Sequence, residues 1–248
     1  MSNTKSNFHF KEVDAEGFET LSVIADAEKF NKWTFETIEP YCSGKILEVG
    51  SGIGNISTFF TKKNYDITLS DIRSNYRDYL TKQFPANQHK IVNLDLVHPQ
   101  FDTEYKNLKE SFDTVFALNV IEHIEDDVQA IANCSALLKP GGTLVILVPA
   151  FQVLYNSFDK ELYHYKRYRD AALENIFVLN NIQPVKSFYF NAGGIPGWFV
   201  SGNILRNKTI PSAQMKTFDR LVPLFRILDK MLLNKIGLSV ICAGKKIS

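Results

Sequence analysis

The stretch that decides the fold is Ile46-Leu47-Glu48-Val49-Gly50-Ser51-Gly52-Ile53-Gly54-Asn55. A β-branched run ends at Val49, three glycines follow at alternate positions, and helical spacing begins near Asn55. Glycines let the chain turn tightly and bring its backbone against a ligand, because no Cβ intervenes. The helix that follows offers free N–H groups and a partial positive charge. The stretch therefore predicts a nucleotide-type pocket at the carboxyl end of a first parallel strand.

Short aliphatic runs alternate with segments of helical spacing along this half of the chain. Such alternation predicts an α/β fold, in which helices cover both faces of a parallel sheet. The expected strands are 45–49, 66–70, 90–94, 112–118 and 142–148, and the helices between them are 55–63, 73–84 and 125–138. The last of these strands is apolar throughout, as a strand buried on both faces should be.

The 248 residues are expected to form a single domain. Long loops without structure are unusual inside compact domains, so the aromatic loop after the fifth strand is a candidate lid. The expected regions are an N-terminal helical cap at 14–40, a cofactor-binding core at 41–148, a lid loop and helix at 149–183, a strand at 184–190, a helical insertion at 192–236 that holds a short helix near 198–205, and a last strand at 238–246.

The composition is that of an ordinary globular protein, with 45% hydrophobic and 22% charged residues. The N-terminal residues MSNTKSNFHFKEVD contain no apolar core of signal-peptide length, and no run of about 18 apolar residues predicts a membrane span. The three cysteines, Cys42, Cys134 and Cys242, are too scattered for a disulfide framework or a zinc site. A cytoplasmic location is the default expectation.

Charge is distributed unevenly along the chain. Residues 181–248 hold ten Lys or Arg and two acids, a balance of +8, whereas residues 1–180 hold 18 bases and 25 acids, a balance of −7. Bases line the margins of the amphipathic segment 212–234. This segment is either a solvated helix packed on its own domain, a dimer face, or a peripheral contact with the inner membrane surface. Monomer and homodimer both stay open.

The acid ahead of the glycines narrows the choice of cofactor. A dinucleotide fingerprint places its third glycine where this chain has Asn55. Glu48 would repel a pyrophosphate but attract a cofactor that carries an ammonium group and a sulfonium. Asp71, roughly twenty residues onward, is placed to accept both ribose hydroxyls, with a helix N-cap as the alternative. Asp95 is placed to accept from an adenine amino group or to serve as a turn residue.

Taken together, these segments resemble the successive motifs of class I S-adenosylmethionine-dependent methyltransferases, close to the type 11/12 group of bacteria. The motifs that carry the resemblance are ILEVGSGIGNIS, LSDI, NLDL, FALNVIEHIEDD and LLKPGGTLVILVP. They cover residues 40–150 well and the remainder loosely, and they are specific for the cofactor but hardly for the substrate. The resemblance implies a Rossmann-like seven-stranded sheet whose last strand runs antiparallel, with helices before the first strand and a helical insertion before the last.

The resemblance also implies where the cofactor, S-adenosylmethionine, and its product, S-adenosylhomocysteine, would bind. The methionine part would contact Glu48, Gly50, Ser51, Gly52, Gly54 and the backbone of Asn119, the ribose would contact Asp71 and Ile72, and the adenine would contact Asp95 and Leu96. Methyl transfer is an in-line displacement at the sulfonium carbon, so the protein mainly has to position the acceptor and, where needed, remove one proton.

Two histidines are candidates for the catalytic base. His123 lies at the mouth of the cofactor site, where the resemblance favours a structural role. With Glu122 it is also a candidate metal pair, as in quinone-type O-methyltransferases, but the sequence offers no third ligand and no metal is expected. His164 lies in the aromatic lid loop and suits proton removal from a hydroxyl, with a packing role as its alternative.

The aromatic residues of the lid favour a flat or apolar acceptor. The expected substrate contacts are Tyr155, Tyr165, Tyr168 and Arg167, the last as a fork for an acidic group. The expected function is methyl transfer to a small aromatic or lipid-like acceptor, most simply at oxygen. An NAD(P)-dependent oxidoreductase and a non-catalytic S-adenosylmethionine-binding module are the alternatives. Nucleic acid is not expected as a partner, since the chain lacks an Asn/Asp-Pro-Pro-Tyr/Phe motif.

Overall fold

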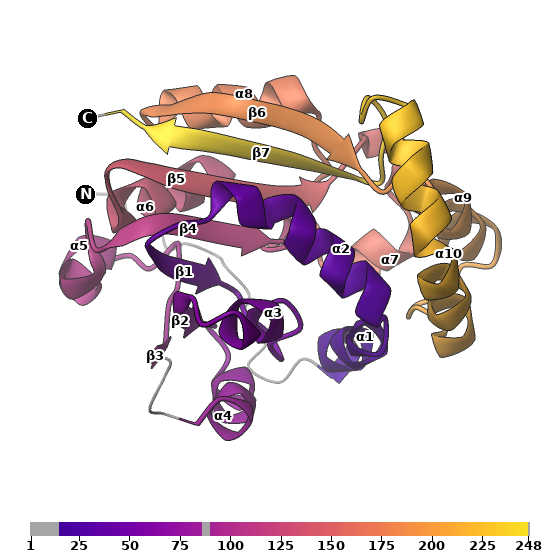
Figure 1. Cartoon of the computed structure of the whole chain (residues 1–248), viewed down its shortest axis with the longest axis horizontal. Helices are drawn as coiled ribbons and strands as arrows, with labels where there is room; N and C mark the ends of the chain where they lie inside the picture. The colour runs from indigo at the N-terminus through magenta and orange to yellow at the C-terminus, as the bar shows by residue number, and fades with distance from the viewer. Residues whose placement is uncertain (1–14, 86–89, 248) are drawn as a thin grey trace, which may run out of the picture.

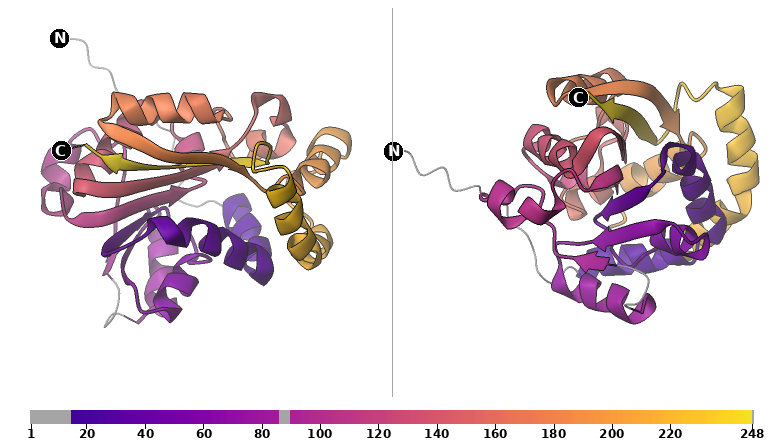
Figure 2. Two further views of the ribbon diagram at one scale, coloured as in Figure 1. Left: turned by 45° about the horizontal axis from the view of Figure 1, so that its top comes forward. Right: turned by 60° about the vertical axis from the view of Figure 1, so that its left-hand side comes forward.

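The computed structural model describes residues 15–85 and 90–247. The stretch 1–14, in which the sequence predicts no signal peptide, lies outside them, as does the first residue of the predicted helical cap. The fold is built on a seven-stranded sheet in the order β3-β2-β1-β4-β5-β7-β6. Helices lie on both of its faces (Figures 1 and 2).

The strands confirm the predicted topology. Their bounds are β1 Lys45–Val49, β2 Asp66–Ser70, β3 Lys90–Val92, β4 Phe112–Leu118, β5 Leu138–Pro149, β6 Ile182–Phe190 and β7 Ser239–Lys246. The pairs among the first five strands are parallel, whereas β7 is antiparallel to both β5 and β6. The Rossmann-like sheet with an antiparallel last strand is therefore confirmed.

The helices surround this sheet. Their bounds are α1 Ala15–Ala25, α2 Glu28–Ile38, α3 Ser57–Lys62, α4 Ser74–Gln83, α5 Phe101–Glu104, α6 Asp127–Leu137, α7 Ser157–Glu161, α8 Asp170–Leu179, α9 Gly194–Phe199 and α10 Ser212–Met231. Short 3₁₀ or π turns are η1 Glu39–Tyr41, η2 Lys106–Leu108, η3 Ile121–His123, η4 Gln152–Leu154 and η5 Val200–Ile204. The predicted lid loop thus contains η4 and α7. The helix predicted near 198–205 begins earlier, at Gly194.

Strand β5 departs from the prediction at its start. The sequence Lys139-Pro140-Gly141-Gly142 reads as a stop, which placed the strand at 142–148. In the structure Leu138 already pairs with Phe112 of β4, and the four residues form an irregularity before the regular register resumes at Thr143. From Gly142 to Pro149 every residue is buried, because helices cover both faces of this central strand.

Two apolar clusters hold the layers together. One joins the sheet to α6 and α8, and the other joins it to α2, α3 and α10. All three cysteines are buried and free. Within the described residues, no helix is both long and apolar enough to cross a membrane.

The predicted insertion before the last strand is present as α9, η5 and α10. Helix α10 lies beside α2 at the end of the sheet where β5 and β6 finish (Figure 1). The ring of Phe218 packs on that of Phe30, with centroids 5.4 Å apart, and Asp219 accepts a hydrogen bond from the Phe30 backbone N–H at 2.9 Å. The insertion is therefore anchored to the N-terminal helices as well as to the sheet.

Candidate active site

The glycine turn after β1 adopts a backbone that only glycine accepts without strain. Gly50, Gly52 and Gly54 have φ angles of 69°, 54° and 83°. A Cβ on Gly50 would lie 2.5 Å from Cγ2 of Val120, the residue after Asn119. The turn therefore packs directly against the chain just after the carboxyl end of β4, and a side chain at Gly50 would not fit there.

Two side chains fasten this turn to the end of β2. Asp71 accepts hydrogen bonds from the backbone N–H groups of Gly52 at 3.0 Å and Arg73 at 2.9 Å. The hydroxyl of Ser51 accepts from the backbone N–H of Ser70 at 3.2 Å. Burial raises the pKa of Asp71, and its backbone hydrogen bonds oppose the shift. Asp71 thus shapes the turn and the start of α4, while its ribose contact stays a prediction.

Glu48 lies beneath the turn and accepts a hydrogen bond from the Ser57 hydroxyl in the first turn of α3. Burial raises the pKa of this carboxyl to about 7, although hydrogen bonds from Ser57 and Ser51 act in the opposite direction. A cation beside it would favour the ionised form. Glu48 therefore suits the ammonium group of a methionine-type cofactor.

The predicted adenine side is held by backbone contacts. Asp95 accepts from the N–H of Val97 at 2.9 Å, which realises the turn role that the sequence left open. Leu96 is buried, and its carbonyl accepts from the Asn133 side chain at 2.7 Å. Contacts of Asp95 and Leu96 with adenine stay predictions.

Two other predicted cofactor contacts offer their backbone. Asn119 has a φ of 54°, and its N–H donates to the Leu147 carbonyl at 2.8 Å. The carbonyl of Ile72 accepts from the Arg77 guanidinium at 2.6 Å. Both residues follow strands that end at the glycine turn's edge of the sheet, so they border the same site.

A buried network organises the segment 149–183, the predicted lid loop and helix, which is called the lid from here on. Nδ1 of His164 lies 2.8 Å from Oδ1 of Asp159, and Nε of Arg167 donates to both carboxylate oxygens, at 2.9 and 3.0 Å. Burial opposes ionisation of Asp159, but the hydrogen bond with His164 and the charge of Arg167 outweigh it and hold its pKa below the usual value. Because Asp159 is ionised, the proton of the neutral imidazole is placed on Nδ1 and Nε2 is left as an acceptor.

The lid reaches back to the end of β4. The N–H of Tyr165 donates to the Glu122 carbonyl at 2.8 Å, and the rings of His123 and His164 meet edge to face, with centroids 4.6 Å apart. Burial lowers the pKa of His123 to about 3, with help from His164 and Arg73. A histidine of such low basicity is a poor proton acceptor at neutral pH. This low basicity disfavours His123 as the catalytic base.

Glu122 completes a cluster that the sequence did not reveal. Its carboxyl is fully buried, neither oxygen has a hydrogen-bond partner among the residues that the structure describes, and burial raises its pKa to about 8. Ligand atoms of Glu122, His123 and His164 lie within 4.8 Å of one another, and this is the one such group within residues 15–85 and 90–247. The missing third residue beside Glu122 and His123 is thus supplied by the lid, a correction to the sequence analysis.

Two of the predicted substrate contacts have other partners. The Arg167 guanidinium is occupied by Asp159, by the Ala150 carbonyl at 3.0 Å and by the Trp198 ring, whose centroid is 4.7 Å away. The buried Tyr168 donates its hydroxyl to Asp127 at 2.9 Å. The expected roles of Arg167 and Tyr168 in substrate binding are corrected accordingly: both hold the lid in place.

The other two predicted contacts differ from each other in their surroundings. Tyr155 donates its hydroxyl to the His164 carbonyl at 2.8 Å, and Tyr165 keeps 46% of its surface exposed. The sequence analysis missed Asp159 altogether. A usable signal was the Asn156-x-x-Asp159 spacing, which forms the capping box of α7 and fixes Asp159 at its N-terminus.

Known proteins resemble this chain over the residues that build the glycine turn and the neighbouring strands. Residues 47–144 match the protein family described as methyltransferase domain. The chain is 30% identical over 128 residues to the ubiquinone biosynthesis O-methyltransferase of Haemophilus ducreyi, a match that covers 47% of this chain and 51% of the relative. The corresponding protein of Coxiella burnetii is 28% identical over 118 residues, covering 48% and 47%. The chain thus spans about half the length of the curated relatives it matches.

Solved structures share the fold. A SAM-dependent methyltransferase from Archaeoglobus fulgidus superposes with a TM-score of 0.57 at 16% identity, covering 87% of this chain and 94% of the other. Phosphoethanolamine N-methyltransferase 2 from Haemonchus contortus, in complex with S-adenosyl-L-methionine, gives 0.60 at 15% identity, covering 95% and 60%. Residues 47–144 are therefore similar to a methyltransferase domain, and the chain shares its fold with S-adenosylmethionine-dependent methyltransferases.

Proposed function

We propose that this protein transfers a methyl group from S-adenosylmethionine to a hydroxyl of a small aromatic or lipid-like acceptor, with His164 as the base. The observation that carries the proposal is the buried Asp159–His164 pair, 2.8 Å apart, on a lid that contacts the end of β4. The carboxylate fixes the proton on Nδ1 and turns the lone pair of Nε2 away from itself.

The chemical step is a displacement in which the atoms balance simply. The acceptor oxygen forms a bond to the methyl carbon while the bond from that carbon to sulfur breaks, and the sulfonium becomes a neutral thioether. The hydroxyl proton moves to Nε2 of His164. Asp159 then stabilises the imidazolium, because opposite charges lie at hydrogen-bond distance in a buried setting.

The acceptor class is supported by the lid and by the relatives. Aromatic pairs surround the network, with Phe158 against Trp198 at 4.9 Å and Phe151 stacked on Tyr189 at 4.6 Å. Relatives named as O-methyltransferases of ubiquinone biosynthesis favour transfer to oxygen. The oxidoreductase alternative requires a nicotinamide cofactor. Glu48, beneath the glycine turn, disfavours binding of the pyrophosphate of such a cofactor.

The first test is binding of the product. Isothermal titration of the wild-type protein with S-adenosylhomocysteine should show saturable binding, and NADH should show none. Binding of NADH instead would favour the oxidoreductase. A panel of phenols, catechols and prenylated phenols with radiolabelled methyl donor then identifies the acceptor. Product binding without transfer to any member would favour the non-catalytic module.

The second test addresses the base. His164→Gln should lower kcat by roughly 10² to 10⁴ while S-adenosylhomocysteine binds as before, because general-base catalysis contributes a factor of that size. His98→Gln is the matched control, since the His98 imidazole lies outside the lid, where it accepts a hydrogen bond from the Gln100 backbone and meets the Tyr105 ring edge to face. An unchanged kcat in His164→Gln would refute the assignment.

A further inference from the structure

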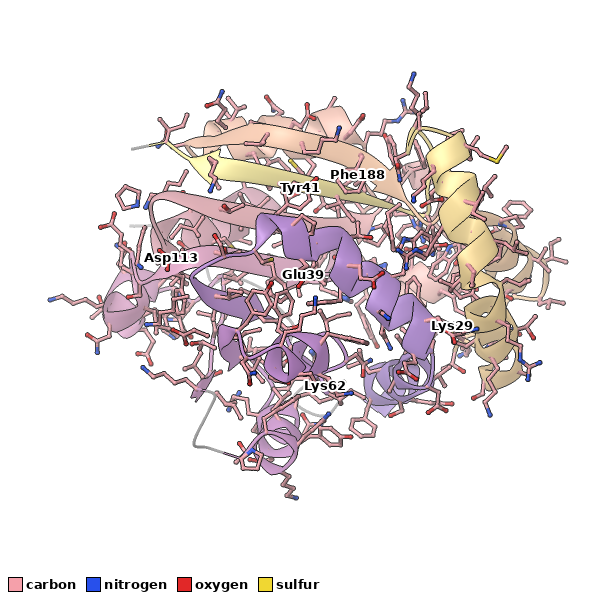
Figure 3. The ribbon with its side chains drawn as sticks, viewed as in Figure 1. Lys29, Glu39, Tyr41, Lys62, Asp113 and Phe188 are labelled. Carbon is pink, nitrogen blue, oxygen red and sulfur yellow. The ribbon has the colours of Figure 1, made fainter. Side chains whose placement is uncertain are left out.

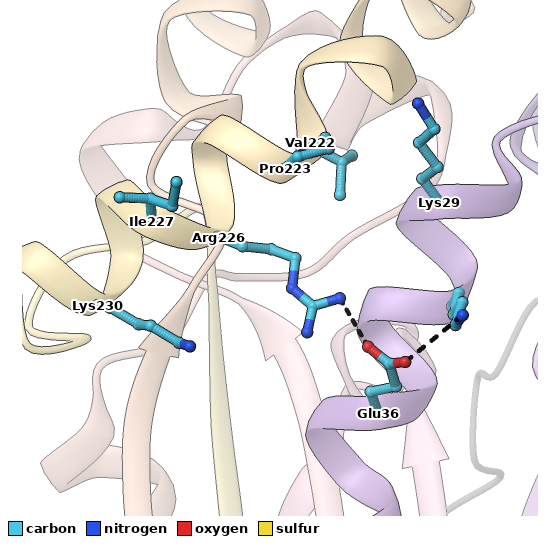
Figure 4. A pocket seen from close by; sticks show the side chains of 8 residues that line it. Lys29, Glu36, Val222, Pro223, Arg226, Ile227 and Lys230 are labelled. Atoms are coloured by element: carbon cyan, nitrogen blue, oxygen red, sulfur yellow. Dashed lines mark hydrogen bonds and ion pairs between the residues drawn. The ribbon is translucent and has the colours of Figure 1, made fainter.

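A groove lies between α2 and α10, apart from the site described above. Its volume is about 410 Å³, and it shares no lining residue with the glycine turn or the lid. Figure 4 shows that both helices contribute its lining. The lining residues are Lys29, Lys32, Glu36, Val222, Pro223, Arg226, Ile227 and Lys230.

The groove carries excess positive charge. Its single acid, Glu36, accepts a hydrogen bond from Arg226 at 2.6 Å and lies 3.9 Å from the Lys32 ammonium (Figure 4). Lys29 and Lys230 have no ion-pair partner within the part of the chain that the structure describes, and Lys29 extends from α2 at the side nearest α10 (Figure 3). Two unneutralised ammonium groups therefore border one groove, which favours an anionic ligand.

An exposed apolar surface adjoins these charges. Leu224, Ile227 and Met231 on α10 keep 60%, 56% and 76% of their surface exposed, and Leu233 and Ile236 after the helix keep 72% and 48%. Side chains of this kind at spacings of three and four residues form one face of a helix. Bases beside an exposed apolar face are the features by which amphipathic helices bind a lipid interface.

The acids of α10 are both engaged by backbone N–H groups of the protein itself. Asp219 accepts from the Phe30 backbone on α2, and the buried Asp229 accepts from the backbone N–H groups of Asn191 and Ala192, at 2.6 and 2.8 Å. These are the helix's two acids, so its outward charges, Lys216, Arg220 and Lys230, are all positive.

We infer that this surface docks the protein on an anionic lipid bilayer, with lipid phosphates at Lys29 and Lys230 and the apolar side chains of α10 at the acyl boundary. An anionic bilayer complements both features, because phosphate attracts ammonium and the acyl region takes up exposed aliphatic groups. A second copy of the chain would bring the same bases together across a two-fold axis. A nucleic acid would leave Leu224, Ile227 and Met231 in water.

The docking surface is connected to the lid. Gln214 of α10 hydrogen-bonds Ser201 and the Gly197 carbonyl, and the Trp198 indole donates to the Leu154 carbonyl at 3.1 Å. Ser157, at the start of α7, donates to the Gly202 carbonyl at 2.8 Å. A bilayer at α10 therefore lies on the lid side of the molecule. Delivery of a lipid-like acceptor from that bilayer rests on the proposed function, whereas docking itself does not.

Flotation with phosphatidylcholine vesicles, with and without phosphatidylglycerol, tests the inference. The wild-type protein should bind only the anionic vesicles, and added salt should release it. The double change Lys29→Gln with Lys230→Gln should weaken binding by about thirtyfold, since each lysine near an anionic surface contributes a factor of about five. Leu224→Ser with Met231→Ser should weaken binding to the same vesicles through loss of apolar contact.

The matched control is Lys62→Gln with Lys82→Gln, which removes the same charge from α3 and α4, two helices that contribute no residue to the groove; Figure 3 shows Lys62 apart from Lys29. This variant should bind the vesicles to within a few-fold of wild type, the effect of net charge alone. Equal binding to neutral and anionic vesicles would overturn the inference. So would a stable dimer in sedimentation that the Leu224/Met231 change dissociates, or binding of nucleic acid but not of vesicles. S-adenosylhomocysteine titration of the same variants should match wild type, which separates failure of docking from failure of the proposed function.

Discussion

The glycine turn and the lid meet at one edge of the sheet, yet they are built differently. The turn is made of backbone: three glycines with positive φ, tied to the neighbouring strand by Asp71 from the end of that strand and by Ser51 of the turn itself. The lid is made of side chains, and Asp159 gathers His164 and Arg167 in a buried cluster. Backbone geometry recognises a constant cofactor, whereas side-chain networks can be exchanged to suit different acceptors.

The largest effect expected on the affinity for the cofactor product tests the glycine turn, the region built from backbone. Gly50→Ala should lower the affinity for S-adenosylhomocysteine by about a hundredfold or more, measured by calorimetry. A φ of 69° strains alanine, and the new Cβ would lie 2.5 Å from Val120. Gly141→Ala is the control, because Gly141 has a φ of 75° but no atom within 4 Å of its Cβ position. Equal affinities for both variants would contradict a backbone-built site.

A smaller effect is expected from the side-chain half. Asp159→Asn should lower kcat by about tenfold to a hundredfold, because an amide cannot neutralise the imidazolium of His164. The affinity for S-adenosylhomocysteine should stay at the wild-type value. Asp127→Asn removes another lid contact, the one with Tyr168, and should change stability more than kcat. A parallel loss of product affinity and kcat in Asp159→Asn would indicate that the lid supports the cofactor site instead.

The smallest expected effect is a pH dependence of cofactor-product affinity caused by Glu48. Glu48 is a side chain within the glycine-turn region, which is otherwise built from backbone. The pKa of Glu48 is raised to about 7, so the carboxylate is present above pH 7 and is lost as the pH falls below it. Affinity for S-adenosylhomocysteine, whose ammonium the carboxylate attracts, should therefore fall by about tenfold from pH 8 to pH 6. Glu48→Gln should show a flat profile, and an unchanged slope would assign the titration elsewhere.

The two regions also differ in how well the sequence predicts them. Alternating strands and helices predicted a parallel sheet covered by helices, the family resemblance implied its antiparallel last strand, and β1, β2 and β4 have the predicted bounds. Where prediction failed, long-range pairing prevailed over local pattern: Leu138 pairs with Phe112 although a proline and two glycines follow it. Local propensity carries no information about such a partner in a neighbouring strand.

Within the candidate site, the residues around the glycine turn could also be predicted from local sequence, whereas the partners of the lid residues could not. Glycine spacing and the acids at strand ends identified residues around the turn, because local chain geometry places them there. The sequence predicted that the Arg167 guanidinium binds an acidic group of the substrate. Its partner in the structure is Asp159 of α7, which comes to lie beside it only when the lid folds. Nothing local distinguishes a charged residue bound to substrate from one bound to its own chain.

The order of the strands also bears on how the molecule assembles. Strand β6 hydrogen-bonds only to β7 within the described residues, and β7 follows it in the chain after the whole helical insertion. Strands β1 to β5 can pair earlier, since each joins a neighbour already made. Closing a long loop is slow compared with local pairing. The part of the sheet made of β1 to β5, which carries the glycine turn, is therefore expected to form first during folding. Strand β6 is expected to join the sheet only after β7 has paired with β5.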